Sequence, residues 1–470
     1  MVRHRMHSLF LLAAATSILV RASPTERLGR IYLKRKTPES VEAAIWTTDQ
    51  PSRRADEVLD PSALGSLTNI EALAIRNARI VDLPRSIGKL TQLRALDIRR
   101  EPHLKALPSS MGHLKRLERL QIDGGLRQIP ASIGSMTSLR VLHIENSRIE
   151  SVPESIGMLT NLTTLLIHGP NMIPTLPSSV ATLTQLKELG ITSLNFNEFP
   201  LTLCSLTNLT SLCYAGRGGR FQDIPSCIGR LEQLRLLDLS GAELSGLPHQ
   251  LTRLKRLESL DLSGNQFARI PDVVMCLPTL ISLNLAKNRI HSLDIPHEAF
   301  SGLERLDVSS NNLQRLPDVL DGLAHVKKLN LSDNRLSEIP DSIQVIRRLQ
   351  SLRVADNRLR SLPKSLANLR HLTALDLSGN SLSKLPEVVT NLTHLAYLNV
   401  SSNNLTSLPD GIVHLKRLRQ LAAKDNRLST LPASLEALPG LRYLFLGGNQ
   451  FSDDAKKRLK ERLPNVWIYW

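Results

Sequence analysis

Aromatic residues, cysteines and long apolar runs are all scarce in this sequence. Phe, Trp and Tyr make up only 3% of the 470 residues, so any core must be built from aliphatic side chains. Four cysteines are too few to frame a disulfide-rich fold in a chain of this length. The apolar stretch Leu9–Val20 is too short to span a bilayer, so we expect no integral membrane segment in the mature chain.

The motifs of common catalytic and metal sites are missing as well. The 13 histidines are scattered, and there is no HExxH, no CxxC, no Walker loop and no GxSxG with partner residues. The segments that flank the repetitive part of the chain, described below, are too short to bury a separate catalytic core. We therefore expect a protein that is not an enzyme and that needs no cofactor and no metal.

The N-terminal segment has the pattern of an export signal. Arg3 and Arg5 precede the apolar run, and Ala22 ends it with a small residue that is typical of a cleavage site. This pattern predicts a signal peptide over 1–22, cleavage after Ala22, and a secreted or exported protein. The alternative is an uncleaved tail on a cytoplasmic protein.

One unit of 23 residues recurs along most of the chain. It has the form LxxLxLxxNxLxxLPxxIxxLxx and extends from near Ile70 to near Phe451. Asparagines spaced by 23 residues, which we call the asparagine ladder, mark the later units: Asn265, Asn288, Asn311, Asn334, Asn357, Asn380, Asn403, Asn426 and Asn449. So many residues in one register do not arise by chance, and they predict a repeat architecture.

The repeat predicts an α/β repeat solenoid on physical grounds. Each unit has one short strand, LxL, whose leucines are buried only if neighbouring units stack on both sides. Stacking gives one long parallel concave sheet, which we expect to hold about 17 strands. The proline begins a short helical or 3₁₀ segment on the convex side. The ladder asparagine is placed to bond backbone groups that would otherwise be buried without partners.

These residues and their spacing resemble the leucine-rich repeat (LRR) family, whose fold is a horseshoe. The later units, LPxxIxxLxxLxxLxLxxNxL, look like intracellular Ras-group LRR scaffolds, which act in signal transduction. The motif of the earlier units, IGxLTxLRxLxI, resembles LRR effectors of plant-associated bacteria. The resemblance implies a recognition scaffold. The cysteine-free ends depart from animal and plant extracellular members, which usually pin their caps with disulfides.

Five segments follow from the repeat and its flanks. They are a signal peptide (1–22), an N-terminal helical cap (23–60), an irregular LRR half (61–242), a regular LRR half (243–451) and a C-terminal cap (452–470).

Both caps are expected to contain a helix. In the N-terminal cap, the segment 37–39 reads as a helix start, with Val41, Ala44 and Ile45 on one face. In the C-terminal cap, Ser452 is placed to cap a helix, and a last partial strand follows it.

The irregular half carries no asparagine at the ladder position. Its residues there, 22 to 25 positions apart, are Ala78, Glu101, Gly125, Ser147, Pro170, Leu194, Arg217 and Ala242. We expect the turn amides of this half to be satisfied by water or by shifted backbone. In the regular half, Leu293 and Asp294 replace the aliphatic-Pro pair of repeat ten, so we expect its outer side to bulge or to repack.

The residue between the last two leucines of LxxLxL is expected to project from the concave face. We call this row the polar stripe; it consists of Asp238, Asp261, Asn284, Asp307, Asn330, Arg353, Asp376 and Asn399. Basic residues recur on both sides of it in the same phase, so the pattern would steer a partner of alternating charge. A purely structural role for these polar residues is also open, because LDLSxN is a common sequence in such repeats.

Aromatic residues concentrate at the C-terminal end of the regular half. Those expected on the concave side, with Tyr469 beside them, are Tyr397, Tyr443, Phe445 and Trp467. Aromatic anchors carry much of the energy of protein interfaces, although capping of the last repeat is an alternative role for Trp467. The irregular half has a more basic inner face, formed by Arg76, Arg99, Arg100, Arg119, His143 and His168.

These observations predict a non-enzymatic protein–protein interaction scaffold that binds a protein partner on its concave LRR surface, as a secreted recognition or effector protein. One alternative is an intracellular signalling scaffold. Another is the substrate-recognition part of a ubiquitin-ligase-like effector enzyme whose catalytic domain is absent from this chain. The net charge of +16 favours nucleic acid, but the basic residues flank an acidic stripe and lack an aromatic platform, so we expect no nucleic-acid partner.

Overall fold

The computed structural model describes residues 30–37, 40–47, 57–59, 61–216, 223–297 and 299–470. The predicted signal peptide and Arg217 lie outside these residues. The chain divides into two compact units, Met1–Arg220 (unit 1) and Phe221–Trp470 (unit 2), and each is described by itself.

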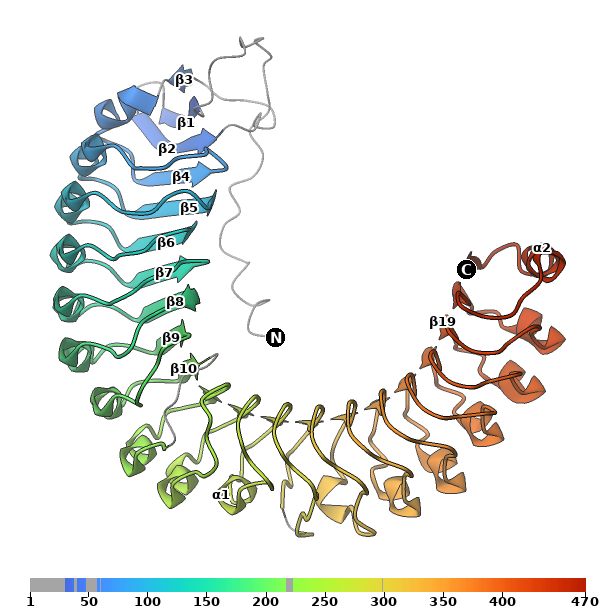
Figure 1. Ribbon diagram of the computed structural model, residues 1–470. Helices are drawn as coiled ribbons and strands as arrows, with labels where there is room; N and C mark the ends of the chain where they lie inside the picture. The colour runs from blue at the N-terminus through green and yellow to red at the C-terminus, as the bar shows by residue number, and fades with distance from the viewer. Residues whose placement is uncertain (1–29, 38–39, 48–56, 60, 217–222, 298) are drawn as a thin grey trace. The chain divides into compact units, whose positions relative to one another are not determined.

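Unit 1 is a stack of coils in which each strand pairs in parallel with the next (Figure 1). The strands are β4 (Ala72–Arg76), β5 (Ala95–Glu101), β6 (Arg119–Gly124), β7 (Val141–Glu145), β8 (Thr164–Asn171), β9 (Glu188–Ser193) and β10 (Ser211–Gly216). The outer segments are 3₁₀ turns: η2 (Pro61–Ser66), η3 (Arg85–Lys89), η4 (Ser109–His113), η5 (Ala131–Ser135), η6 (Glu154–Met158), η7 (Ser178–Thr182) and η8 (Leu201–Ser205). The predicted solenoid is therefore confirmed in this unit.

The N-terminal cap is built from strands, so the predicted helix is wrong. β1 (Arg30–Thr37) pairs antiparallel with β2 (Ser40–Thr47) and with β3 (Glu57–Leu59), and β2 pairs in parallel with β4. The first strand of a solenoid leaves a row of backbone donors and acceptors unpaired at its edge. A further strand satisfies that row, whereas a helix would cover only the apolar interior.

Unit 2 repeats the same coil with shorter, three-residue strands on the inner side of its arc (Figure 1). The strands are β11 (Leu236–Asp238), β12 (Ser259–Asp261), β13 (Ser282–Asn284), β14 (Arg305–Asp307), β15 (Lys328–Asn330), β16 (Ser351–Arg353), β17 (Ala374–Asp376), β18 (Tyr397–Asn399), β19 (Gln420–Ala422), β20 (Tyr443–Phe445) and β21 (Trp467–Tyr469). With those of unit 1, the described residues contain eighteen such parallel strands, seven and eleven, close to the number expected.

The outer segments of unit 2 begin directly after a proline, as predicted, with one exception. They are η9 (Ser226–Arg230), η10 (His249–Arg253), α1 (Asp272–Met275), η11 (Asp321–Leu323), η12 (Asp341–Val345), η13 (Lys364–Asn368), η14 (Glu387–Asn391), η15 (Asp410–His414) and η16 (Ala433–Ala437). The exception is η11, which begins after Leu320. Pro363, for example, has a φ of −71° and an extended ψ just before η13. Repeat ten has no helical segment among its described residues between β13 and β14, so the irregularity predicted there is confirmed.

The C-terminal cap forms as predicted. Helix α2 (Asp453–Arg462) begins at Ser452, whose hydroxyl oxygen accepts a 3.2 Å hydrogen bond from the backbone N–H of Ala455. Leu459 and Leu463 are buried against the last coil. The strand β21 follows and pairs with β20.

The asparagine ladder holds the turns of unit 2 together. Asn357 shows the geometry: its side-chain oxygen accepts the N–H of Leu336 (2.9 Å), and its amide donates to the carbonyls of Leu331 (3.0 Å) and Val354 (3.3 Å). All nine asparagines bond the backbone of their own coil and of the preceding coil in this way. The predicted structural role is confirmed, and only Asn449, in the last coil, is half-buried rather than buried.

In unit 1, other side chains form the hydrogen bonds to the turn backbone that the asparagine ladder forms in unit 2. The carboxylate of buried Glu101 accepts the N–H groups of Ala78 and Ile80 in the preceding coil. Asn171 accepts the N–H of Ile149 (2.8 Å) and donates to the carbonyl of Thr192 (3.0 Å). The expectation that water or shifted backbone would serve these turns is wrong where Glu101 and Asn171 act. At Gly125 it is confirmed, because the backbone N–H of Gly125 donates to the Glu101 carbonyl beyond a shift in register.

A shift in strand register explains why the repeat spacing did not identify Asn171 as a ladder residue. The β5–β6 pairing shifts before Glu101, and the β8–β9 pairing shifts before Asn171. Asn171 therefore lies one position after Pro170, the residue that the 23-residue count selects. The buried hydroxyl of Ser193 donates a hydrogen bond to the carbonyl of Ile173 (2.8 Å) in the preceding coil.

Glycine allows the outer segments of unit 1 to pack closely. A Cβ atom added to Gly134 would lie 2.4 Å from the carbonyl oxygen of Ser155, and one added to Gly157 would lie 2.5 Å from that of Ser179. In unit 2 the matching position, four residues after the proline, holds a glycine once, at Gly229, where an added Cβ atom would lie 2.6 Å from the carbonyl oxygen of Gln250. Other coils of unit 2 hold side chains there, such as Ala367, Thr390 and Val413. Close contacts of this kind are therefore more frequent in unit 1.

Candidate functional site

The polar stripe forms one continuous row on the inner face of unit 2. Each three-residue strand buries its middle residue and directs the two flanking residues to that face. The third residue of each strand is in register with the third residue of the next, from β11 to β18. The structure thus places all eight residues of the predicted stripe side by side.

Many polar groups of the stripe are already engaged within the fold. Asp261 accepts hydrogen bonds from the backbone N–H (2.9 Å) and hydroxyl (2.6 Å) of Ser263, and Asn284 donates to its other oxygen (2.8 Å). Asp307 and Asn330 form the same cross-strand pair (3.0 Å). Much of the stripe therefore stabilises the turns that follow the strands, as the structural explanation requires.

Two groups modify the electrostatics of the stripe. Burial raises the pKa of the Asp261 carboxyl, and the neighbouring charge of Asp238 raises it further, while the hydrogen bonds of Ser263 and Asn284 oppose the shift. Arg353 is exposed and stands in register between Asn330 and Asp376, so it breaks the acidic and amide row.

The aromatic residues of the last two strands come together. Tyr443 is in register with Trp467, and Phe445 is in register with Tyr469. The rings of Phe445 and Tyr469 stack at 4.6 Å with an interplanar angle of 12°. We call Tyr443, Phe445, Trp467 and Tyr469 the aromatic patch. Tyr397 lies two strands away in the row of Tyr443, with Gln420 between them, so the structure separates it from the patch.

The aromatic patch is open to solvent. Trp467 is 69% exposed, Tyr443 43% and Tyr469 44%. Trp470, by contrast, packs its ring edge-on against Phe451 at 5.4 Å and covers the end of the last coil. Capping therefore accounts for Trp470, but it does not account for the exposure of Trp467.

The inner face of unit 1 is less basic in effect than its residues predict. Arg76 (3.3 Å) and Arg99 (2.8 Å) both contact the carboxylate of Asp97, which is only 4% exposed. His143 lies 2.9 Å from a carboxylate oxygen of Glu145 and edge-on to His168 at 6.2 Å. Much of this predicted patch is therefore neutralised within the fold.

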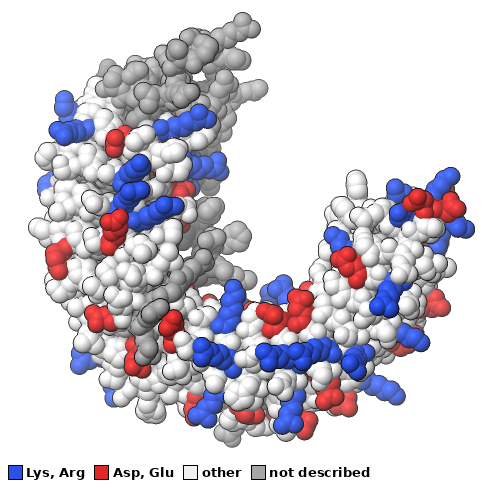
Figure 2. Space-filling model, viewed as in Figure 1, with Lys and Arg blue, Asp and Glu red and all other residues white. Residues whose placement is uncertain are grey.

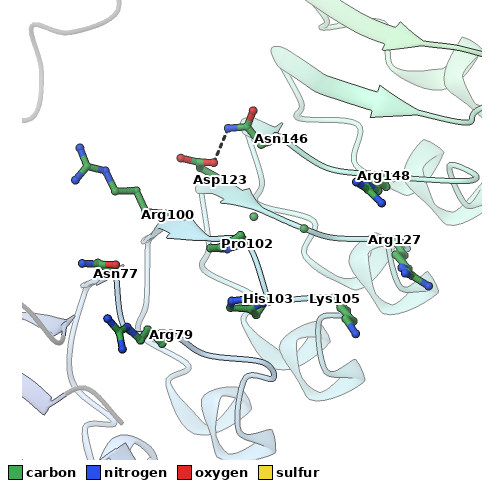
Figure 3. Close-up of a pocket in the computed structure, with 12 residues that line it drawn as sticks. Asn77, Arg79, Arg100, Pro102, His103, Lys105, Asp123, Arg127, Asn146 and Arg148 are labelled. Atoms are coloured by element: carbon green, nitrogen blue, oxygen red, sulfur yellow. Dashed lines mark hydrogen bonds between the residues drawn. The ribbon is translucent and has the colours of Figure 1, made fainter. Parts of the chain in front are cut away.

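A cavity that sequence reasoning missed opens beside that face. It has a volume of about 920 Å³ and lies among the turns that follow β4, β5, β6 and β7 (Figure 3). We call it the rim cavity; its basic lining residues are Arg79, Arg100, His103, Lys105, Arg127 and Arg148. Lys and Arg side chains gather on this part of unit 1 (Figure 2). The uneven repeat spacing hides their common phase, so the sequence showed only Arg100.

Two further properties of the described residues bear on function. No helix in that part of the chain is long and apolar enough to cross a membrane. Nor do three or more His, Cys, Asp or Glu side chains of those residues gather in a way that would hold a metal ion.

Comparison with known proteins finds leucine-rich repeats along the chain. A model described as leucine-rich repeat region matches residues 52–148 and 348–466, and two leucine-rich repeat models match 278–336 and 256–277. No curated protein matches the chain.

Solved structures show the same fold. The chain is similar to a leucine-rich repeat protein of Leptospira interrogans, with 26% identity, a TM-score of 0.54, and 87% of this chain and 98% of that chain covered. It is similar to the plant peptide hormone receptor RGFR1 in complex with RGF2, with 24% identity, a TM-score of 0.52, and coverage of 83% and 76%. A TDR receptor aligns with 24% identity, a TM-score of 0.55, and coverage of 83% and 78%.

Proposed function

Since this chain belongs to the leucine-rich repeat family, we propose that it is a non-enzymatic recognition protein that binds a protein partner on the inner face of unit 2. Protein–protein interaction is typical of the family's fold, in which a stack of strands presents a rigid surface to a partner. A preformed surface loses little conformational entropy on binding, which favours affinity.

The aromatic patch is the observation that carries this proposal. Soluble proteins rarely expose neighbouring large aromatic side chains without a functional reason. Tyrosine and tryptophan are also the residues most enriched among interface hot spots. Four such rings on two adjacent strands, three of them more than two-fifths exposed, give a partner an apolar anchor site.

The surroundings of the patch indicate what the partner carries. The ammonium group of Lys424 lies 5.2 Å from the centre of the Phe445 ring, so the patch has a positive edge. The polar stripe begins beyond Ala422, with Asn399 and Asp376 as its nearest members. A partner segment with an aromatic or aliphatic anchor, followed by basic or amide side chains, matches this order.

Site-specific cross-linking tests the proposal. A photoreactive phenylalanine analogue replaces Tyr443 in one full-length variant and Val319 in another. Val319 is a matched control because it is 58% exposed in the same unit but lies outside the sheet, before η11. We expect a cross-linked protein from native cells or their surroundings at position 443 and not at position 319.

Affinity measurements then decide whether the patch binds that protein. We expect the double substitution Trp467→Ala/Tyr443→Ala to weaken the affinity at least about tenfold, which is the loss of one hot spot. Val319→Ala should leave the affinity unchanged. Equal cross-linking at both positions, or an unchanged affinity of the double variant, would refute binding at the inner face.

We also propose that the protein is exported, which rests on the basic and apolar pattern of its first 22 residues. Intact mass and N-terminal sequencing of the protein from culture supernatant and from cell lysate test this. A chain in the supernatant that begins at Ser23 supports export. An intact Met1 form confined to the lysate overturns it and favours an intracellular signalling scaffold.

A further inference from the structure

We propose that the rim cavity of unit 1 binds an acidic oligosaccharide, that is, a short sugar polymer that carries carboxylate or sulfate groups. This inference is independent of the proposed function, because it rests on residues of unit 1 alone.

The first support is uncompensated positive charge. No ion pair between a carboxylate and Arg79, Arg127 or Arg148 is present in the part of the chain that the structure describes. The same is true of the other two Lys and Arg residues of the lining, whereas Arg76 and Arg99 nearby share Asp97. Neighbouring cations repel one another, so a bound anion would stabilise this arrangement.

The acidic residues near the cavity leave this charge in place. Asp123 is the one carboxylate of the lining, and it accepts a 2.7 Å hydrogen bond from Asn146 (Figure 3). Glu101 is fully buried beneath the lining, where its oxygens accept backbone N–H groups. The lining thus holds five Lys and Arg side chains against one carboxylate.

The walls of the cavity are preformed. The backbone N–H of Arg127 donates to the carbonyl of Lys105 (3.0 Å), and that of Arg148 donates to the carbonyl of Leu126 (2.7 Å). A Cβ atom added to Gly125 in the lining would lie 2.3 Å from the carbonyl oxygen of Pro102, so only glycine fits there. The basic side chains therefore project from turns whose positions the fold has already fixed.

Size and polarity favour a sugar over a nucleic acid. A volume of about 920 Å³ lies within the range of pockets that hold small ligands. The Asp123–Asn146 pair supplies hydrogen-bonding groups of the kind that sugar hydroxyls need. Proteins that hold single-stranded nucleic acid stack its bases on aromatic rings, and the cavity lining contains no Phe, Tyr or Trp.

Strand spacing favours a linear ligand with repeated charge. Neighbouring coils are about 4.8 Å apart, so turns from four coils present cations over roughly 14 Å. A chain of charged sugars offers anions along such a length, whereas a single inorganic anion would satisfy only part of it. Arg127 and Arg148 lie on adjacent coils and form one side of the cavity (Figure 3).

Binding of defined probes to the full chain tests the inference. The probes are a sulfated heparin hexasaccharide, a polygalacturonate hexasaccharide, a neutral dextran hexasaccharide and a single-stranded DNA of six phosphates. Calorimetric titration at two salt concentrations gives the affinity and its salt dependence. We expect one or both acidic sugars to bind, dextran not to bind, and DNA to bind at least tenfold more weakly than the better acidic sugar.

Two double variants of equal charge change separate site binding from general charge attraction. Arg127→Ala/Arg148→Ala removes one side of the rim cavity. The control, Arg335→Ala/Arg358→Ala, removes two arginines from a smaller cavity of unit 2, about 440 Å³, which Glu338 also lines. We expect at least a tenfold loss of affinity for the first, less than a twofold loss for the control, and partial rescue by Arg127→Lys/Arg148→Lys.

Several results would overturn the inference. Equal losses in the two double variants would mean non-specific attraction to a cationic protein. DNA binding as strong as acidic sugar binding, with the same loss in the Arg127→Ala/Arg148→Ala variant, would assign the cavity to nucleic acid. No binding of either acidic sugar, with the circular dichroism spectrum and Tm intact, would leave the cavity without this ligand class.

Discussion

In unit 2 an asparagine holds each turn that follows a strand, whereas in unit 1 a glutamate, a displaced asparagine and a serine share this task. Asn357 serves its own coil and the preceding one through three backbone groups. Glu101 serves the preceding coil through two N–H groups. The buried backbone sets the requirement, and the residue type is secondary as long as donors and acceptors find partners.

The surfaces of the two units also differ in regularity. Unit 2 keeps a strict period, and its inner face carries a stripe bonded within the fold and an exposed aromatic patch. Unit 1 departs from the period, and its turns after β4 to β7 surround a basic cavity. The regular repeats thus form an orderly sheet with an exposed aromatic patch, and the turns of the irregular repeats surround the rim cavity.

Removal of a central ladder residue should give the largest effect. Asn357→Ala leaves the buried N–H of Leu336 without a partner. It also removes one of the two amide donors from each of the carbonyls of Leu331 and Val354, which Asn334 and Asn380 still serve. We expect a loss of about 3 kcal/mol in the free energy of unfolding, since an unpaired buried N–H and each lost hydrogen bond cost on the order of 1 kcal/mol. Urea denaturation measures it, and hydrogen exchange at Leu336 shows whether the loss is local.

The last ladder residue provides the control for that substitution. Asn449 is only half-buried, so water can replace part of its hydrogen bonding. Asn449→Ala should cost about half as much as Asn357→Ala. An equal cost would mean that burial does not set the value of the ladder.

Removal of Glu101, which replaces a ladder asparagine in unit 1, should cause the next largest loss of stability. Glu101→Ala removes the acceptor of two buried N–H groups, and we expect a loss of about 2 kcal/mol by the same reasoning. Urea denaturation followed by hydrogen exchange at Ala78 and Ile80 checks it. A loss below the error of the measurement would contradict the equivalence of Glu101 and the asparagine ladder.

A smaller loss of stability is expected from substitutions at glycines on the outer side of the coils. Gly134→Ala forces a Cβ atom against the Ser155 carbonyl and should cost about 1 kcal/mol or more in the free energy of unfolding. Gly246→Ala, in unit 2, is the matched control because no atom lies within 4 Å of the added Cβ. Thermal unfolding of both variants compares them, and similar shifts in Tm would show that the close contact at Gly134 does not set the cost of the substitution.

The smallest effect is a dependence on pH, which Glu101 introduces and which the ladder asparagines cannot, because they do not titrate. Burial raises the pKa of its carboxyl above the ordinary 4.5, although the N–H groups of Ala78 and Ile80 act against the shift. The folded protein therefore binds this proton more tightly than the unfolded chain. The stability that the proton contributes is present below pH 4.5 and is lost as pH rises through the raised pKa.

Comparison with Glu101→Gln isolates that contribution, because glutamine does not titrate. The free energy of unfolding of the wild-type protein should fall relative to that of the variant as pH rises above 4.5. A constant difference, or a change of opposite sign, would contradict the raised pKa.

The strict period makes the regular half predictable. Nine asparagines in one phase set the register of the strands, so the repeat spacing alone places the members of the polar stripe in one row. The capping signal at Ser452 is local and strong, and it predicts the right helix.

The remaining features depend on interactions that a linear count cannot show. The N-terminal cap is a strand because β4 has an open edge, and the local signal at 37–39 does not report that edge. Asn171 lies beyond a shift in register, so it falls outside the phase of the ladder. The rim cavity needs turns from four coils to converge, and the different exposures of Trp467 and Trp470 depend on tertiary packing.

Hydrogen exchange of the full chain, with and without the protein that cross-links at Tyr443, tests the central claim most directly. The account predicts slower exchange in β19, β20 and β21 of unit 2 on binding, and no change in the turns after β4 to β7. Protection confined to unit 1, or to the outer 3₁₀ segments of unit 2, would contradict recognition by the inner face.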